Sequence, residues 1–420
     1  MAWFGSKYNG FSLTLKLEML EQAKVVIGAN YGDEGKGLMT DYFAAQSSNS
    51  LVIRFNGGCQ AGHTVTTPDG ARHVFSHFGS GSLACAATYL SKHFAVNPML
   101  YLKERPKLSA VMGGLPLLYV DGRAPVTTLF DILLNQMVED FRSVNRHGSC
   151  GMGFGETINR QEEGDYALVV EDLADGPSLR KKLRAIRDEY LPRRARGLGL
   201  PDCVLATEKA THFFGTDVLI DALMASASEF CQDATVVSSP RELVGSFESV
   251  VMEGAQGLML DQTRGAFPFV TRSNTGLTNV VEVALESGID KLAVSYVSRA
   301  YLTRHGAGPL AKELGHKPYA AVVDPTNMPN DYQGSLRFAY LDHDLLATSI
   351  AADLASVAGT RVVIEPTLAI SCLDQIGLEA ACFWRAGELV ASTIDAQLLD
   401  LGRITTVANV SFGPSREHVQ

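Results

Sequence analysis

The chain has 420 residues, 46% of them hydrophobic and 20% charged, so it can bury a large core and has the composition of a soluble globular protein. Its formal net charge of -10 argues against general nucleic-acid binding, although a local basic pocket for small phosphates is compatible with it. No apolar stretch is long enough to span a membrane, and the seven cysteines contain no C-x-x-C pair. We therefore expect a cytoplasmic protein with reduced thiols, no structural zinc and no membrane or nucleic-acid partner.

The N-terminal segment, residues 1–22, lacks the apolar core of a signal peptide and is interpreted as an extension. Beyond it, apolar β-branched runs alternate with helical stretches. The strands expected from these runs are residues 23–28, 51–55, 249–254, 291–297 and 361–371, and the helices include 36–45 and 279–286. This alternation predicts an α/β fold, in which residues 23–420 form a single large domain on a mostly parallel central β-sheet with helical excursions.

The first expected strand runs into a glycine-rich loop, GANYGDEGKG, at residues 28–37. Glycine N–H groups that lead into a helix N-terminus form an anion site, so the loop indicates a P-loop-like nucleotide site. It is not the ordinary P-loop, because Asn30 stands at the leading glycine position and Gly37 follows Lys36 where Ser or Thr is required. Asp33 and Glu34 would repel a phosphate, so at least one of them is expected to bind a metal or to act as a base.

Four more glycine clusters follow along the chain: NGGCQAGHTV, HGSCGMGFGETINR, MEGAQGLMLD and TRHGAGPL. A lone histidine is more often a structural hydrogen-bonding group. His63, however, directly follows a glycine loop in a chain that has another loop of glycines and acids, and this context favours a general acid. Because ligand loops gather at the carboxyl ends of parallel strands, five such loops are better explained by one nucleotide site than by unrelated turns. The basic segment 178–196 is interpreted as a solvated helix in preference to a phosphate-binding surface.

The motifs GDEGKG, GG-x-x-AGHT, EGAQG-x-x-LD, P-x-VT-x-SNT and TR-x-GAGP occur in this order. Together they resemble the adenylosuccinate synthetase family, from about residue 25 to residue 419. The resemblance implies a ligase that joins L-aspartate to C6 of IMP through a 6-phosphoryl intermediate, with GTP as co-substrate and Mg2+ as cofactor. It also implies a homodimer.

The resemblance assigns roles residue by residue. Asp33 would be the catalytic base and His63 the catalytic acid, and the metal would be held by Asp33 and the carbonyl of Gly62. The residues expected to contact GTP are Gly32, Asp33, Glu34, Gly35, Lys36, Gly37, Gly62, His63, Thr64, Cys372, Leu373, Asp374, Ser411 and Gly413. The residues expected to contact IMP are Asp33, Lys36, Gln60, Ala61, Gly62, His63, Ser149, Cys150, Arg160, Gln256 and Thr271.

Several positions depart from the family pattern. Gln60 and Cys150 replace a family asparagine and threonine, and Cys372 replaces the lysine of a K-L-D triplet whose aspartate, here Asp374, reads guanine. The family's aspartate-binding run of arginines is lost, which leaves Arg337, with Arg304, as the candidate dicarboxylate ligands.

These departures leave two other functions open beside the IMP ligase. One is the same chemistry on dGMP, as in a phage branch that makes a 2-amino product. The other is a nucleotide-binding regulator without catalysis. Retention of Asp33, Lys36, His63 and Gln256 argues against the regulator, and retention of Asp33 favours IMP.

Overall fold

The computed structural model describes residues 22–202, 215–327 and 333–420. The expected N-terminal extension lies outside the described residues except for Gln22, which begins the first strand. None of the helices in these ranges is both long and apolar enough to cross a bilayer.

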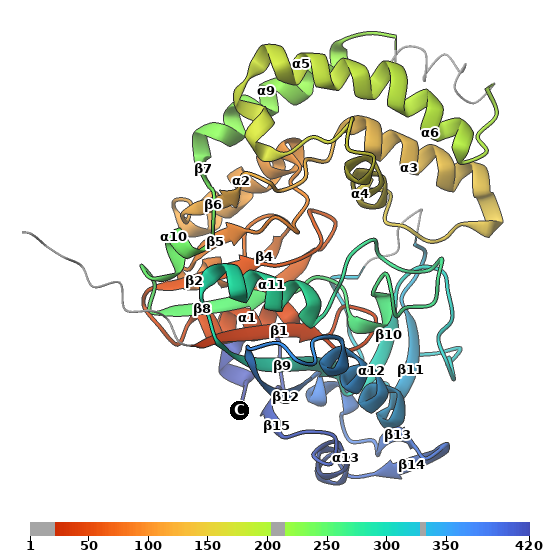
Figure 1. Cartoon of the computed structure of the whole chain (residues 1–420). Coiled ribbons are helices and arrows are strands. Elements are labelled where there is room, and N and C mark those ends of the chain that lie inside the picture. Colours follow the sequence, from red (N-terminus) through yellow and green to blue (C-terminus); the bar gives the residue numbers. More distant parts are fainter. Residues whose placement is uncertain (1–21, 203–214, 328–332) are drawn as a thin grey trace, which may run out of the picture.

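A large parallel sheet organises the fold (Figure 1). Within the described residues, all of its strand pairs are parallel. Across the sheet, the nine strands within the described residues are β15 (Val407–Val410), β12 (Val363–Ser371), β9 (Lys291–Arg299), β1 (Gln22–Gly28), β8 (Ser249–Glu253), β2 (Ser50–Arg54), β5 (Ala87–Leu90), β6 (Leu118–Asp121) and β7 (Ala234–Val237). The five expected strands are all present, so the predicted α/β fold with a mostly parallel sheet is confirmed.

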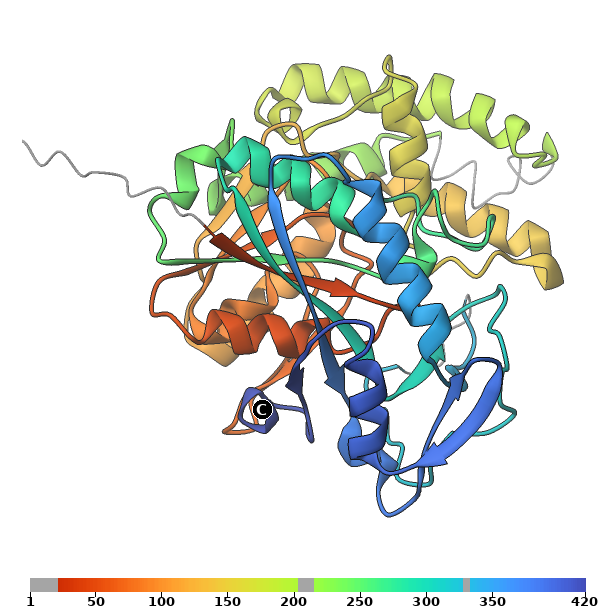
Figure 2. The same ribbon diagram turned by 60° about the horizontal axis from the view of Figure 1, so that its bottom comes forward.

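The α-helices surround this sheet. Those in the described residues are α1 (Lys36–Ala44), α2 (Pro98–Met112), α3 (Leu129–Arg142), α4 (Phe154–Glu162), α5 (Gly176–Ala185), α6 (Leu191–Gly197), α9 (Val218–Asp233), α10 (Arg241–Val244), α11 (Leu277–Ser287), α12 (His343–Ser356) and α13 (Ile394–Leu401). In Figure 2, α1 lies on one face of the sheet and α11 and α12 lie on the other. The two helices expected from the sequence are therefore present as α1 and α11.

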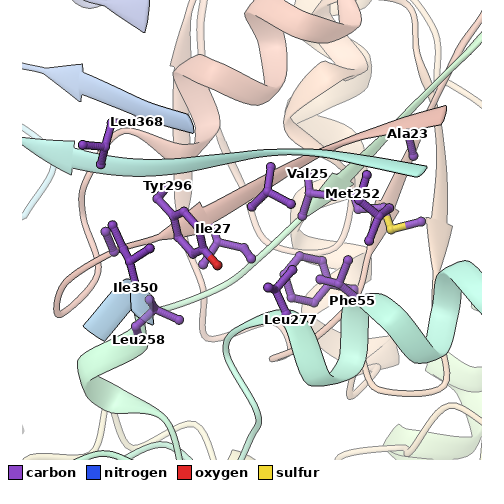
Figure 3. Close-up of a cluster of buried hydrophobic side chains, with 14 of the residues drawn as sticks. Ala23, Val25, Ile27, Phe55, Met252, Leu258, Leu277, Tyr296, Ile350 and Leu368 are labelled. Carbon is purple, nitrogen blue, oxygen red and sulfur yellow. The ribbon is translucent and has the colours of Figure 1, made fainter. Parts of the chain in front are cut away.

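The alternation of β1 shows how the core forms on both faces. Val25 and Ile27 are fully buried in the cluster that contains Leu277 of α11 and Ile350 of α12 (Figure 3). Val26, between them, belongs to the cluster under α1. Successive side chains of a strand point to opposite faces, so a strand covered on both faces appears in the sequence as a continuous apolar run.

A second hydrophobic core lies among the helices that Figure 1 shows together at the top, including α3, α5, α6 and α9. The basic segment 178–196 belongs to this layer, as α5, a π-helical turn (Ile186–Tyr190) and α6. Leu179 and Leu183 are buried there, whereas Arg184 on the same helix is half exposed and pairs with Asp217 at 2.5 Å. The segment is helical as expected, and the exposure of Arg184 fits a solvated face.

Two small sheets complete the described structure. One has the strand order β10 (Tyr301–Arg304), β11 (Arg337–Asp342), β13 (Ala381–Arg385) and β14 (Glu388–Ser392). The other pairs β3 (His63–Thr66) with β4 (Arg72–Phe75) in antiparallel orientation. Neither small sheet was predicted from the sequence.

The parallel order of the central sheet brings distant loops to one edge. β1 lies between β8 and β9, and β2 lies beyond β8. The glycine loops that follow β1, β2 and β8 therefore start from neighbouring strand ends, as expected for a ligand site in an α/β sheet.

Candidate functional site

The loop between β1 and α1 is built around Glu34, which is almost completely buried. One carboxylate oxygen accepts hydrogen bonds from the backbone N–H groups of Asn30 (3.1 Å) and Gly32 (2.7 Å). The other oxygen pairs with the Lys36 ammonium at 2.6 Å. Any side chain at Gly28 would collide with both partners, because its Cβ would lie 2.5 Å from Glu34 Oε2 and 2.8 Å from Lys36 Nζ. Glu34 therefore holds the loop from inside and does not line the cavity, unlike the direct GTP contact expected of it.

Asp33 adopts a backbone conformation that side chains rarely take, with a φ of 62°, between Gly32 and Gly35, which both have φ of 96°. For a residue other than glycine, this left-handed conformation is unfavourable in free energy. Such strained residues are concentrated at functional sites. The backbone carbonyl of Asp33 accepts a hydrogen bond from Arg299 at the end of β9. The strained turn presents Asp33 to the cavity.

These loops surround a cavity of about 570 Å³. The predicted site residues that line it are Gly32, Asp33, Gly35, Lys36, Gly37, Gln60, Ala61, Gly62, His63, Thr64, Ser149, Cys150, Gln256, Thr271 and Arg304. They come from segments far apart in the sequence, so the structure brings together most of what the motifs indicated.

Several polar atoms at this cavity are buried without a partner in the protein. They are Gln60 Nε2, Thr64 Oγ1, Gln256 Oε1, Arg272 Nε, Arg304 Nε and His305 Nδ1. Buried polar groups are nearly always hydrogen-bonded in native proteins. Their gathering around one cavity fits a polar ligand that supplies the missing hydrogen bonds.

His63 stands at the start of β3 and lines the cavity. Its Nδ1 lies 2.6 Å from a carboxylate oxygen of Glu253, the last residue of β8. Burial lowers the pKa of His63 below its usual value, and the charge of Glu253, which raises it, compensates only in part. For Glu253, burial raises the pKa, but the charge of Arg54 and the contacts with His63 and Ser80 outweigh burial and lower it to about 2.

The loop that carries Ser149 and Cys150 faces the loop after β10. A Cβ on Gly148 would lie 2.4 Å from the backbone nitrogen of Ala307, so the two loops touch along their backbones. Ser149 Oγ donates to Asn135 Oδ1 at 3.1 Å. Burial raises the pKa of the Cys150 thiol, which keeps it neutral, so Cys150 offers a phosphate no charge.

Arg160 does not fit the expected contact with a nucleotide. Its side chain is fully buried between α3 and α4 and does not line the cavity. It forms a two-pronged pair with Asp131, at 3.0 Å and 2.9 Å, and donates to the carbonyls of Tyr166 (2.9 Å) and Val126 (2.7 Å). The expectation is corrected: these bonds occupy the guanidinium, so Arg160 stabilises the helical layer.

The two arginines expected to bind a dicarboxylate differ in placement. Arg304 lines the cavity, but its guanidinium donates to the carbonyls of Phe269, Ala307 and Pro309 and stacks over Tyr31. Arg337 is absent from the cavity lining.

Arg337 pairs with Glu313 and donates to the carbonyls of Gly306 (3.0 Å) and Gly308 (2.9 Å). Arg337 therefore supports the turn after Arg304.

The residues expected to read guanine form a separate group beside the first loop. Leu373 N–H donates to the carbonyl of Ser411 at 3.2 Å, so the segments that follow β12 and β15 are adjacent as expected. Ser371 Oγ donates to the Glu34 carbonyl at 2.7 Å, which ties this group to the loop after β1. Asp374 is exposed on one side, and the part of its carboxyl that is shielded from water raises its pKa. None of Cys372, Leu373, Asp374, Ser411 and Gly413 lines the cavity.

Sequence reasoning missed Arg299 and Asp324, which both line the cavity. They form an ion pair at 2.9 Å. Burial raises the pKa of Asp324, but the charge of Arg299 and hydrogen bonds from Asn327 outweigh burial and lower it to about 2. An arginine at the end of the buried strand KLAVSYVSR was the available signal for Arg299, whereas Asp324 lies in a loop without a motif.

Sequence comparison matches the family model for adenylosuccinate synthetase to residues 25–332. Curated adenylosuccinate synthetases from Picrophilus torridus and Brevibacillus brevis are each 30% identical to this chain, over 291 and 295 residues. Each match covers 69% of this chain and 65% of the relative, so the similarity spans about two thirds of these enzymes. The family match ends before Arg337, Asp374 and Ser411, short of the extent to residue 419 that the motifs suggested.

Solved structures share the fold over nearly the whole chain. The fully ligated adenylosuccinate synthetase from Plasmodium falciparum has a TM-score of 0.72 at 17% identity, covering 94% of this chain and 99% of that one. The cyanophage S-2L succinoaminodeoxyadenylate synthetase, bound to dGMP and to dATP as an energy donor, has a TM-score of 0.59 at 15% identity, covering 95% of each chain. With the family model matched to most of its length, this chain belongs to the adenylosuccinate synthetase family of nucleotide-dependent ligases.

Proposed function

We propose that this protein is a GTP-dependent ligase that joins the amine of L-aspartate to C6 of IMP, giving adenylosuccinate, GDP and phosphate. The observation that carries the proposal is that Asp33, Lys36 and His63 face one cavity that is also lined by unpartnered polar groups. A base, a cation and an acid around one polar cavity are the groups that this phosphoryl transfer requires.

In the proposed reaction, Asp33 takes the proton from N1 of the purine, and the 6-oxygen attacks the γ-phosphate of GTP. His63 acts as the acid toward the transferring phosphoryl group. The amine of aspartate then attacks C6, and the C6–O bond breaks to release phosphate. Lys36 and the glycine N–H groups of the first loop balance the phosphate charge.

Mg2+ fits the oxygen donors that this cavity offers. Among the described residues, no three His, Cys, Asp or Glu side chains gather as a metal cluster. Mg2+ does not need such a cluster, because it is usually bound by one or two protein oxygens together with substrate phosphates. The Asp33 carboxylate and the Gly62 carbonyl would hold it, and the ion would supply charge neutralisation at the phosphates.

A second acceptor, dGMP, is favoured by the changed cavity wall. Gln60 and Cys150 stand where family members have asparagine and threonine, and both line the cavity. The cyanophage structure of similar fold holds dGMP, with dATP as the energy donor. A catalytically inactive regulator is less well supported, because Asp33, Lys36, His63 and Gln256 all face the same space.

A coupled phosphate-release assay tests the proposal. The protein is mixed with Mg2+, L-aspartate and GTP, and IMP or dGMP is added as acceptor, with Asp33→Asn as the matched blank. Phosphate release that needs both IMP and aspartate supports the proposal. Phosphate release that occurs only with dGMP supports the second acceptor. If neither IMP nor dGMP gives phosphate release, both ligase functions are refuted.

A further inference from the structure

Glu253 is a buried carboxylate that the proposed reaction does not use directly. It ends β8 in the motif MEGAQG and is fully buried, behind His63 as seen from the cavity, which it does not line. One oxygen, Oε2, accepts the backbone N–H of Ser80 at 3.0 Å. The other, Oε1, accepts the Ser80 hydroxyl and lies 2.6 Å from Nδ1 of His63.

We infer that Glu253 is the positioning residue of His63: it accepts the Nδ1 hydrogen, turns Nε2 toward the reacting phosphoryl group and balances the charge of the imidazolium that forms when Nε2 is protonated to act as the acid. This inference rests on the proposed function for its chemical meaning. It follows from the donor and acceptor roles, because an ionised carboxylate only accepts hydrogen bonds and the imidazole nitrogen that faces it must therefore carry the hydrogen. Among the described residues, no other hydrogen bond is made by the ring.

The surroundings hold both partners in place. On the glycine side, a Cβ at Gly37 would lie 3.3 Å from Cβ of His63 and 2.9 Å from the Thr64 carbonyl, so the histidine backbone packs closely against the start of α1. On the other side, Arg54 lies 3.7 Å from Glu253 Oε2 and donates to the Phe78 carbonyl at 3.1 Å. The charged groups that act on His63 are thus Glu253 from β8, Arg54 from β2 and Lys36 from α1.

The segment HFGSGSL, residues 77–83, holds Glu253 in place. Ser80 begins a short 3-10 helix and directs its backbone N–H and its hydroxyl at the two oxygens of Glu253. The backbone N–H cannot rotate away, so the atom that it faces must be an acceptor. This constraint makes the outcome of a Glu253→Gln substitution predictable.

In Glu253→Gln, the amide oxygen is expected to take the position opposite the Ser80 N–H. The amide NH2 group then faces Nδ1 of His63, which must become an acceptor, so the imidazole proton moves to Nε2. The expected result is an inverted His63 tautomer in the free enzyme. We expect kcat to fall about 10- to 100-fold, the cost known for a lost partner that orients a histidine, because the neutral amide no longer balances the imidazolium that acts as the acid. The KM values for the nucleotides are expected to change little, because Glu253 does not line the cavity.

The test combines histidine nitrogen NMR with steady-state kinetics on the full chain. The His63 signals are assigned by their loss in His63→Asn, and the tautomer is measured in the wild type and in Glu253→Gln. Glu253→Asp, which keeps the carboxylate, is expected to retain the Nδ1–H tautomer and to recover part of kcat.

Glu104→Gln is the matched control. Glu104 is also a buried carboxylate beside histidines, with His73 and His77 each 3.5 Å away, and it does not line the cavity. This substitution should leave the His63 tautomer and kcat unchanged.

The outcomes separate the two proposals. An Nε2–H tautomer in the wild type, or an unchanged tautomer and kcat in Glu253→Gln, overturns the positioning role even if the wild type turns over IMP. Loss of kcat in Glu253→Gln together with the inverted tautomer supports it. If the wild type turns over neither IMP nor dGMP, the proposed function fails, and the NMR result still decides whether Glu253 fixes the His63 tautomer.

Discussion

Replacing Arg160 by methionine separates a structural arginine from a nucleotide ligand. Arg160 is fully buried and paired with Asp131, which is also buried and accepts the Thr128 N–H at 2.8 Å as part of the capping box of α3. Methionine keeps much of the side-chain volume but removes every donor.

The expected cost follows from these contacts. Removing one partner of a buried ion pair leaves an uncompensated charge and destabilises a protein by about 3–5 kcal/mol. The carbonyls of Val126 and Tyr166 also lose their donors, in the same helical layer. We therefore expect the local free energy of opening around α3 and α4 to fall by about 3–5 kcal/mol.

Hydrogen exchange followed by mass spectrometry measures this opening directly. Since every 1.4 kcal/mol is tenfold in an equilibrium constant, peptides from residues 126–166 should exchange roughly 10²- to 4 × 10³-fold faster in Arg160→Met. Lys291→Ala is the control, because Lys291 and Glu365 form an exposed pair at 2.8 Å. Such pairs contribute about 0–1 kcal/mol, so its exchange should match the wild type.

The KM for the acceptor nucleotide distinguishes a structural Arg160 from one that binds phosphate. A structural arginine leaves the KM of the folded enzyme for its nucleotide nearly unchanged. A phosphate ligand would instead raise KM roughly 10- to 100-fold, as expected for the loss of a charged hydrogen bond of about 1.5–3 kcal/mol. Unchanged exchange with a raised KM would show that Arg160 reaches a nucleotide and that the structural interpretation is wrong.

Three further substitutions test the site. Asp33→Asn should abolish turnover while nucleotide affinity, measured by calorimetry, persists; normal turnover would refute the base assignment. Asp374→Asn should raise the KM of GTP more than that of ATP, because a carboxylate can accept from two guanine N–H groups; equal responses would place the guanine elsewhere. Arg337→Gln should raise the KM of aspartate about 10- to 100-fold if Arg337 leaves Glu313 for the substrate, whereas an unchanged KM would confine it to supporting its turn.

The central strands could be predicted because they are buried on both faces. The run at 51–55 corresponds to β2, whose residues are all buried, and the run at 291–297 corresponds to β9, in which only Lys291 and Ala293 are partly exposed. A continuous apolar run of this length is typical of a strand that is buried on both faces, so the sequence predicts such a strand directly. The strand β14 is different, because it is largely exposed and its sequence ELVAS carries no such pattern.

The site could be predicted where one motif contains the whole contact. The loop after β1 carries Asp33 and Lys36 within a few residues, and its glycines mark where the backbone must turn. The partnership of His63 with Glu253 joins residues 190 positions apart, and only the parallel pairing of β2 with β8 brings them together. Arg160 was misassigned because a buried arginine and a ligand arginine look alike in a single sequence.

The central claim is that the reaction passes through a 6-phosphoryl intermediate. The most direct test follows the oxygen atom that leaves C6 of IMP. IMP labelled with 18O at C6 is turned over with GTP, Mg2+ and L-aspartate, and the released phosphate is analysed by mass spectrometry. A 6-phosphoryl intermediate breaks the C6–O bond, so we predict adenylosuccinate without the label and phosphate that carries one 18O atom. Unlabelled phosphate, or no aspartate-dependent product from IMP, would contradict the account.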